Sequence, residues 1–121
     1  MQVRNYHDVE PNTEVPGVAL HTVITADEAP RFSMRVFEVE VGGSTPFHTH
    51  EWEHEVFVLS GSGKVRGVDG ERALAPNDAV FVAPDEEHCF TNTGNDMFRF
   101  VCCIPHSTLL AAKDAPDACE G

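Results

Sequence analysis

Three histidines in the middle of the chain, His48, His50 and His54, are close enough in sequence to bind one metal ion. Residues i and i+2 of a strand point to the same side, so His48 and His50 can both reach one ion. His54 follows after a bend or on the next strand and can supply a third nitrogen. Imidazole suits zinc, copper, iron, nickel and manganese. The spacing therefore indicates a transition-metal site, and the alternative is a solvated, histidine-rich loop.

No other motif in the sequence brings catalytic groups together. The chain has no nucleophile elbow, phosphate-binding loop or dinucleotide fingerprint. Its single tyrosine, Tyr6, lies near the N-terminus, which disfavours a tyrosine acid or base. The chemistry of this protein is therefore expected to be that of a bound metal ion.

Short β-rich segments separated by Gly, Pro, Asn and Asp must position these histidines. No window of a dozen residues carries the apolar period of a helix. We expect strands at residues 18–25, 32–41, 55–59, 64–68, 71–74, 79–83, 88–92 and 97–104. Asp69-Gly70 suits a tight hairpin in which both central residues have positive φ. So many short strands at close spacing predict an all-β sandwich or barrel.

The last predicted strand shows which of its faces points inward. Its apolar residues alternate with a face that contains Arg99, and burying an arginine is costly. We therefore expect the other face to join the core. That face consists of Phe98, Phe100, Cys102 and Ile104.

The chain is expected to form one domain over residues 1–121, with a barrel core at about 18–105. The segment 106–121 combines a short helical turn at 108–113 with a polar tail. Of the four cysteines, Cys89, Cys102 and Cys103 are expected to be buried free thiols, and Cys119 to be exposed.

The net charge of −12 excludes two classes of partner. Binding of nucleic acid needs a basic face, which eight Lys and Arg residues among 20 acidic ones cannot supply. The same field repels an anionic membrane surface. The N-terminal segment has no apolar signal-peptide core, so the expected compartment is the cytoplasm. High solubility or a salty cytosol would both explain the acidic surface.

Residues 42–61 resemble the first sequence motif of the cupin superfamily. That motif runs Gly, five residues, His-x-His, three residues, an acidic ligand, six residues, Gly. Gly42, His48, His50 and Gly61 occupy these positions, and His54 stands where the family more often has Glu.

The second cupin motif runs Gly, five residues, Pro-x-Gly, two residues, His, three residues, Asn. His88 and Asn92 match it, whereas Asn77 and Asp85 replace the two glycines and Ala83 replaces the proline. Asn and Asp tolerate left-handed conformations better than most residues. We expect Asn92 to have a structural role, through bonds from its side chain to the backbone of a turn.

The resemblance implies a double-stranded β-helix, also called a jelly-roll barrel, with one divalent transition metal ion per chain. The ion would be Mn, Fe, Ni, Cu or Zn, and its ligands would be His48, His50, His54 and His88. Four neutral ligands leave the ion its full charge of +2, which favours an anion at an open position. The remaining histidines, His7, His21 and His106, are expected at the surface.

Five further residues are expected to line the pocket: Met34, Phe47, Trp52, Phe100 and Cys102. Strand alternation puts either Met34 or Arg35 inward. We expect Met34 inward, whereas Arg35 in that place would be an anion clamp. The carboxylates that orient the histidines would come from Glu51, Glu53, Glu55 or Glu86, if any carboxylate does so.

The function expected from this resemblance is that of a metal-dependent oxidoreductase, of the dioxygenase kind, acting on a small organic molecule. A module that binds or senses a small molecule without catalysis is one alternative, and a Lewis-acid isomerase or lyase is another. A barrel of 121 residues leaves apolar surface uncovered, so we expect a homodimer.

Overall fold

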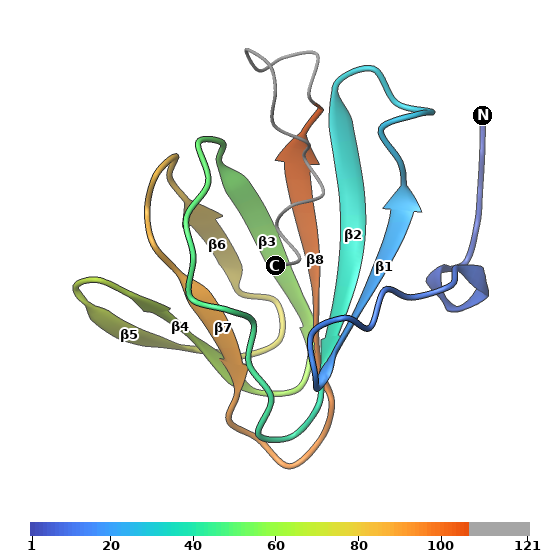
Figure 1. Ribbon diagram of the computed structural model, residues 1–121. Coiled ribbons are helices and arrows are strands. Elements are labelled where there is room, and N and C mark those ends of the chain that lie inside the picture. Colours follow the sequence, from blue (N-terminus) through green and yellow to red (C-terminus); the bar gives the residue numbers. More distant parts are fainter. Residues whose placement is uncertain (107–121) are drawn as a thin grey trace.

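The computed structural model describes residues 1–106, and nearly all of its regular structure is β-strand (Figure 1). A single turn of 3-10 helix, η1 (Tyr6–Asp8), precedes the first strand. The strands follow in this order: β1 (Val18–Ile24), β2 (Phe32–Val39), β3 (His54–Ser60), β4 (Gly63–Gly67), β5 (Gly70–Leu74), β6 (Ala79–Val82), β7 (Cys89–Asn92) and β8 (Phe98–Pro105). The predicted all-β fold is confirmed, and each expected strand is present within about two residues of its predicted bounds.

The strands form two antiparallel sheets, one of five strands and one of three. The larger sheet has the order β1-β2-β8-β3-β6, and the smaller has β5-β4-β7. The order is far from the order along the chain, because β8 lies between β2 and β3. This is the jelly-roll arrangement, and it brings residues distant in sequence side by side in the middle of the larger sheet.

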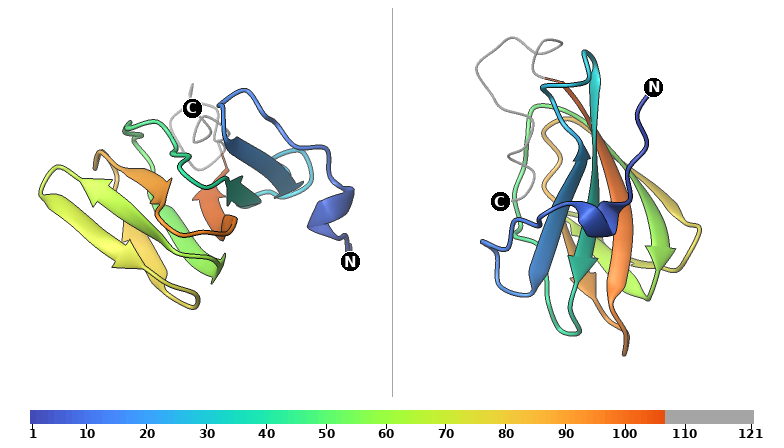
Figure 2. Two further views of the ribbon diagram at one scale, coloured as in Figure 1. Left: turned by 90° about the horizontal axis from the view of Figure 1, so that it is seen from below. Right: turned by 90° about the vertical axis from the view of Figure 1, so that its right-hand side faces the viewer.

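Figure 2 gives two further views of the sheets, with the N-terminal segment on the side away from the β4–β5 hairpin. Tyr6 in η1 donates a hydrogen bond from its hydroxyl to Glu38 (2.7 Å), and Arg99 donates one to the same hydroxyl (2.6 Å). These bonds fix η1 against the outer face of the larger sheet. No helix among residues 1–106 has the length and apolar character needed to cross a membrane.

The core is built from the inward faces of the strands. On β8 the predicted face is confirmed: Phe98, Phe100, Cys102 and Ile104 are all at most 2% exposed. Phe37 stacks on Phe100 from the neighbouring β2, with ring centroids 4.9 Å apart. Burial of aromatic rings dominates the stability of a core this small.

Arg35 and Met34 take the opposite orientations to those expected. Arg35 is fully buried beside Cys102, whereas Met34 is 36% exposed on the outer face. The register explains the outcome. Arg35 pairs with Cys102, an inward residue of β8, and directly paired residues of an antiparallel sheet lie on the same face.

Turn chemistry matches the sequence at two positions and differs at a third. Asn77 and Asp85 have φ of 78° and 66°, so residues in the places of the two motif glycines do adopt the left-handed conformation. The hairpin predicted at Asp69-Gly70 instead turns at Val68 and Asp69, because Gly70 already pairs with Gly67. Only Gly70 of this turn has positive φ, so the expected pair of positive φ values is wrong.

Two histidines expected at the surface are buried, and the prediction is wrong for both. His21 donates from Nδ1 to the Val9 carbonyl (3.0 Å), and His106 lies 2.5 Å from the Ala26 carbonyl. Each imidazole can be buried because it donates a hydrogen bond to a backbone carbonyl that would otherwise lack a donor. Cys89 and Cys102 are buried free thiols as expected, and Cys103 is half-buried. The predicted helical turn, the polar tail and Cys119 lie outside the described residues.

Candidate metal centre

The four histidines that the motifs single out come together at one end of the space between the sheets. His54 begins β3, and His88 immediately precedes β7. His48 lies on the segment between β2 and β3, where its backbone makes a two-residue bridge with His88 (N to O 3.1 and 3.0 Å). The bridge fixes the two motifs to each other, because each histidine's amide donates to the other's carbonyl.

The imidazole rings are close neighbours. Ring centroids lie 4.5 Å apart for His48 and His50, 4.8 Å for His48 and His88, and 4.8 Å for His54 and His88. His54 and His88 are 1% and 3% exposed, and the other two are partly buried. Within residues 1–106, no three His, Cys, Asp or Glu side chains are arranged so that they could hold a metal ion.

Backbone carbonyls set the tautomers of two of these histidines. Nδ1 of His48 lies 2.6 Å from the carbonyl of Pro46, and Nδ1 of His88 lies 2.8 Å from the carbonyl of Glu86. A carbonyl only accepts, so Nδ1 carries the proton in each ring. Nε2 then keeps its lone pair, which is the state a metal ligand requires. Each acceptor is two residues before its histidine.

For His48 and His88, carbonyls therefore accept from Nδ1. The side chains of Glu51, Glu53, Glu55 and Glu86 are exposed. Glu86 contributes through its main chain, and its carboxylate accepts a bond from the Ala83 amide (3.0 Å). Glu53 lies beside Glu55, whose carboxylate raises the pKa of the Glu53 carboxyl above its usual value.

Trp52 and Cys102 contact the remaining two histidines. The Trp52 indole stacks on His50 with centroids 4.6 Å apart and planes 5° from parallel. Cys102 Sγ lies 3.6 Å from Nδ1 of His54. Trp52 restrains the face of the His50 ring and Cys102 contacts a ring nitrogen of His54, and both residues are buried.

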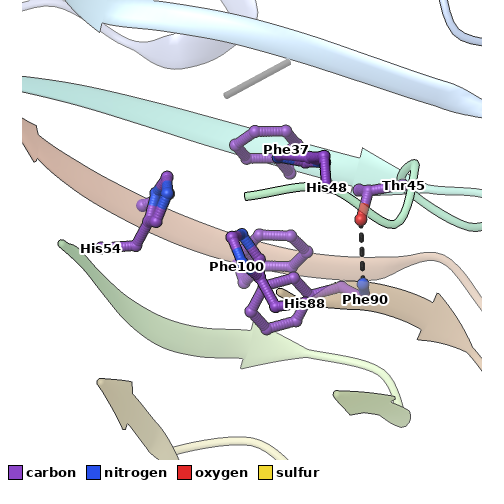
Figure 3. Close-up of a pocket in the computed structure, with 8 residues that line it drawn as sticks. Phe37, Thr45, His48, His54, His88, Phe90 and Phe100 are labelled. Carbon is purple, nitrogen blue, oxygen red and sulfur yellow. Dashed lines mark hydrogen bonds between the residues drawn. The ribbon is translucent and has the colours of Figure 1, made fainter. Parts of the chain in front are cut away.

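A small, mostly apolar cavity adjoins three of the histidines (Figure 3). The enclosed space measures about 10 Å³, on the scale of one water molecule, and its walls are Phe37, Thr45, His48, His54, His88, Phe90, Phe100 and Cys102. The hydroxyl oxygen of Thr45 accepts a hydrogen bond from the Phe90 amide (2.9 Å), which fixes this side chain in the wall. Phe37, Phe90 and Phe100 make up much of the apolar wall, beside the imidazoles (Figure 3).

The expected pocket residues divide into two groups. Phe100 and Cys102 line this cavity, whereas Met34, Phe47 and Trp52 do not. Phe47 is 40% exposed beneath the guanidinium of Arg66, whose Cζ lies 4.4 Å from the ring centroid. Phe37 and Phe90 were not foreseen. Phe37 pairs with Phe100 across β2 and β8, and this register, which the sequence does not show, places it in the cavity wall.

Comparison with known proteins decides the family. Residues 35–104 match the family model described as "Cupin domain". The match covers more than half of the chain and both motifs. The chain belongs to the cupin family. The fold of this cupin and its two motifs are thus those that the sequence resemblance implied.

Relatives of this cupin have different activities. The structure of the polyketide cyclase RemF from Streptomyces resistomycificus is 31% identical, with a TM-score of 0.80 over 87% of this chain and 79% of that one. A cupin 2 domain-containing protein from Halorhodospira halophila is 32% identical, with a TM-score of 0.72 over 95% and 78%. Mannose-1-phosphate guanylyltransferase from Escherichia coli is 33% identical over 84 residues, which are 68% of this chain but only 16% of that protein.

Proposed function

We propose that this cupin is a metal-dependent enzyme that acts on a small carbonyl compound. The observation that carries the proposal is the gathering of four imidazoles beside an apolar cavity, with backbone carbonyls fixing the tautomers of His48 and His88. Neutral nitrogens held in the ligating tautomer are the donor set that divalent transition metals prefer.

The residues present fit one divalent transition metal ion per chain. His48, His50, His54 and His88 would hold it, and Mn, Fe, Ni, Cu and Zn all suit imidazole. A bound ion would supply Lewis-acid polarisation of a carbonyl oxygen. The four neutral donors would add no negative charge to offset the ion, which strengthens its attraction for an enolate or carboxylate oxygen.

Residues around the histidines would orient the imidazole rings and keep water away from part of the cavity. Phe37, Phe90 and Phe100 exclude water from the far side of the cavity, which strengthens electrostatic interactions inside it. Trp52 holds the plane of His50, and Cys102 contacts His54. A substrate bound at the ion would therefore lie against a mostly apolar wall, because the enclosed space itself has room for only about one water molecule.

Two observations favour Lewis-acid chemistry over the oxidoreductase expected from the sequence. Cys102 places an oxidisable thiol in the cavity wall, in contact with a proposed ligand, where an activated oxidant would attack it. In addition, the relative from Streptomyces resistomycificus is a polyketide cyclase, an enzyme of carbonyl-rich substrates. Redox chemistry with O₂ remains the competing proposal, supported by the dry phenyl wall.

Metal binding is tested by elemental analysis of protein stripped with a chelator and reloaded with one metal at a time. The expected result is one ion per chain. His54→Ala and His88→Ala should lose most of it, and His7→Ala, at an exposed position, should keep it. His54→Glu should also keep it, because Glu restores the commoner cupin pattern. Full retention of metal in both alanine variants would refute the four-histidine site.

Activity assays with the reloaded protein separate the two kinds of chemistry. Diketones, phenols and alkenes are offered to the zinc, manganese, iron and copper forms, with oxygen consumption and product formation followed together. Equal turnover with zinc and without oxygen consumption supports the Lewis-acid proposal. Turnover with manganese, iron or copper but not zinc supports the oxidoreductase. Tight binding of a small anion without turnover in any form would favour a binding or sensing module.

A further inference from the structure

Cys102 lies on the inward face of the larger sheet, in the wall of the cavity beside the histidines. The register places it between Arg35 of β2 and Val56 of β3, and it is 2% exposed. Its Sγ lies 3.6 Å from Nδ1 of His54 and 3.5 Å from Nη2 of Arg35, and both distances are within reach of a hydrogen bond to sulfur. Cys102 therefore contacts a proposed metal ligand on one side and a buried cation on the other.

The contact with Arg35 determines what the sulfur does on that side. A guanidinium carries N–H donors and no acceptor, so Sγ of Cys102 accepts the hydrogen bond from Nη2. This bond adds a side-chain link to the main-chain ladder that joins β2 to β8. A thiol sulfur has more than one lone pair, so it can accept a second N–H from another direction. The sulfur is thus held in place with a second bond to His54 within reach.

His54 needs an acceptor at one ring nitrogen when the other nitrogen binds a metal ion. A histidine that binds through Nε2 carries its proton on Nδ1, and this N–H donates to a neighbouring acceptor. His48 and His88 lie outside the strands, and main-chain carbonyls take this role for them. His54 belongs to β3, where it pairs with Val82 and where carbonyls lie in the plane of the sheet. An inward imidazole stands out of that plane, and the neighbour that it meets there is the side chain of Cys102.

We propose that Cys102 is a positioning residue of the metal centre: its sulfur accepts the Nδ1–H of His54, so that Nε2 of this ring is presented to the ion. The inference rests on the proposed metal centre and adds to it the group that orients His54. Cys102 acts through His54 and is not itself a ligand. Its replacement therefore weakens metal binding without removing a nitrogen from the donor set.

The position of the ring proton of His54 is the first test. Long-range ¹H–¹⁵N correlation NMR of the zinc-loaded full chain shows which ring nitrogen carries the proton, and His54→Glu assigns the signals by their loss. We expect the proton on Nδ1 in the wild-type protein. A proton on Nε2, with zinc bound through Nδ1, would leave the sulfur no N–H to accept and would overturn the proposal. This measurement uses the wild-type chain, so it can overturn the proposal even if variants of Cys102 do not fold.

Two variants of nearly equal size separate an acceptor from a packing residue. Cys102→Ala removes the acceptor, and we expect the dissociation constant for zinc to rise about 10-fold, the lower end of the effect of orienting groups. Cys102→Ser keeps an acceptor, so its constant should stay within about threefold of the wild-type value. Cys103→Ala removes a thiol from the outer face of the same strand and should leave the constant unchanged. Competition with a chromophoric zinc chelator measures all four constants.

The outcomes separate this inference from the proposed function. Equal weakening of zinc binding in Cys102→Ser and Cys102→Ala would show a packing role and overturn the proposal, because only the acceptor distinguishes the two variants. Unchanged zinc binding in Cys102→Ala would overturn it as well. In both cases the wild-type chain still binds zinc, and the metal centre stands. Failure of the wild-type chain to bind zinc overturns the metal centre and this inference with it.

Discussion

Replacement of Asn92 by alanine tests whether this motif residue supports the barrel rather than the metal. Its side chain is 3% exposed and makes three hydrogen bonds, each 2.8 Å long. Nδ2 donates to the carbonyls of Val39 and Asp96, and Oδ1 accepts from the amide of Gly94. The three bonds tie β7 to β2 and close the turn that leads to β8.

The expected cost follows from that inventory. Each bond contributes about 1 kcal/mol net, so Asn92→Ala should lower the free energy of unfolding by about 3 kcal/mol. Urea denaturation followed by circular dichroism measures the change. Asn95→Ala, in the same turn but exposed, should change it by less than about 0.5 kcal/mol.

The reasoning is refuted by either of two results for Asn92→Ala. One is a loss in stability no greater than that of Asn95→Ala. The other is a folded variant that has lost its metal, which would make Asn92 part of the metal centre.

Three further predictions concern packing, pH and assembly. Gly61→Ala should destabilise strongly, because its φ is 85° and an added Cβ would lie 2.8 Å from the Cα of Phe98; thermal unfolding measures this. Burial and the nearby Glu55 carboxylate raise the pKa of the Cys103 thiol. Alkylation of Cys103, followed by mass spectrometry, should therefore accelerate at a higher pH than alkylation of free cysteine does. Light scattering after gel filtration should give the mass of a dimer. Phe32, Phe57 and Phe81 are 63%, 45% and 60% exposed on the outer face, so Phe81→Glu should yield a monomer.

Much of the fold could be predicted because local sequence determines it. Strand alternation identified the inward face of β8, since a period of two places Phe98 and Phe100 on one side and Arg99 on the other. The residue types in the motifs also anticipated the left-handed Asn77 and Asp85. Spacing grouped His48, His50 and His54, the cupin resemblance added His88, and the structure brings their rings together.

What the sequence could not provide was register. The choice between Met34 and Arg35 depends on which residue of β2 faces Cys102 across the sheet, and a shift of one residue reverses every side chain. The expectation that Met34 points inward therefore failed, and the barrel buries Arg35 instead. His21 was misplaced for a related reason, because its partner, the Val9 carbonyl, lies in a segment with no periodic pattern.

Tautomers were also beyond the sequence. The sequence suggested nearby carboxylates as the groups that orient the histidines, whereas His48 and His88 use main-chain carbonyls two residues before them. These bonds depend on the backbone path of two loops that residue types do not specify.

X-ray absorption of the zinc-loaded protein tests the four-histidine site, because it identifies the atoms bound to the ion. We expect a first shell of nitrogen and oxygen at about 2.0–2.2 Å, with the outer-shell scattering of about four imidazoles and no sulfur. His88→Ala should lose the zinc or show one imidazole fewer. A sulfur atom at about 2.3 Å, or a shell with fewer than three imidazoles in the wild-type protein, would contradict it.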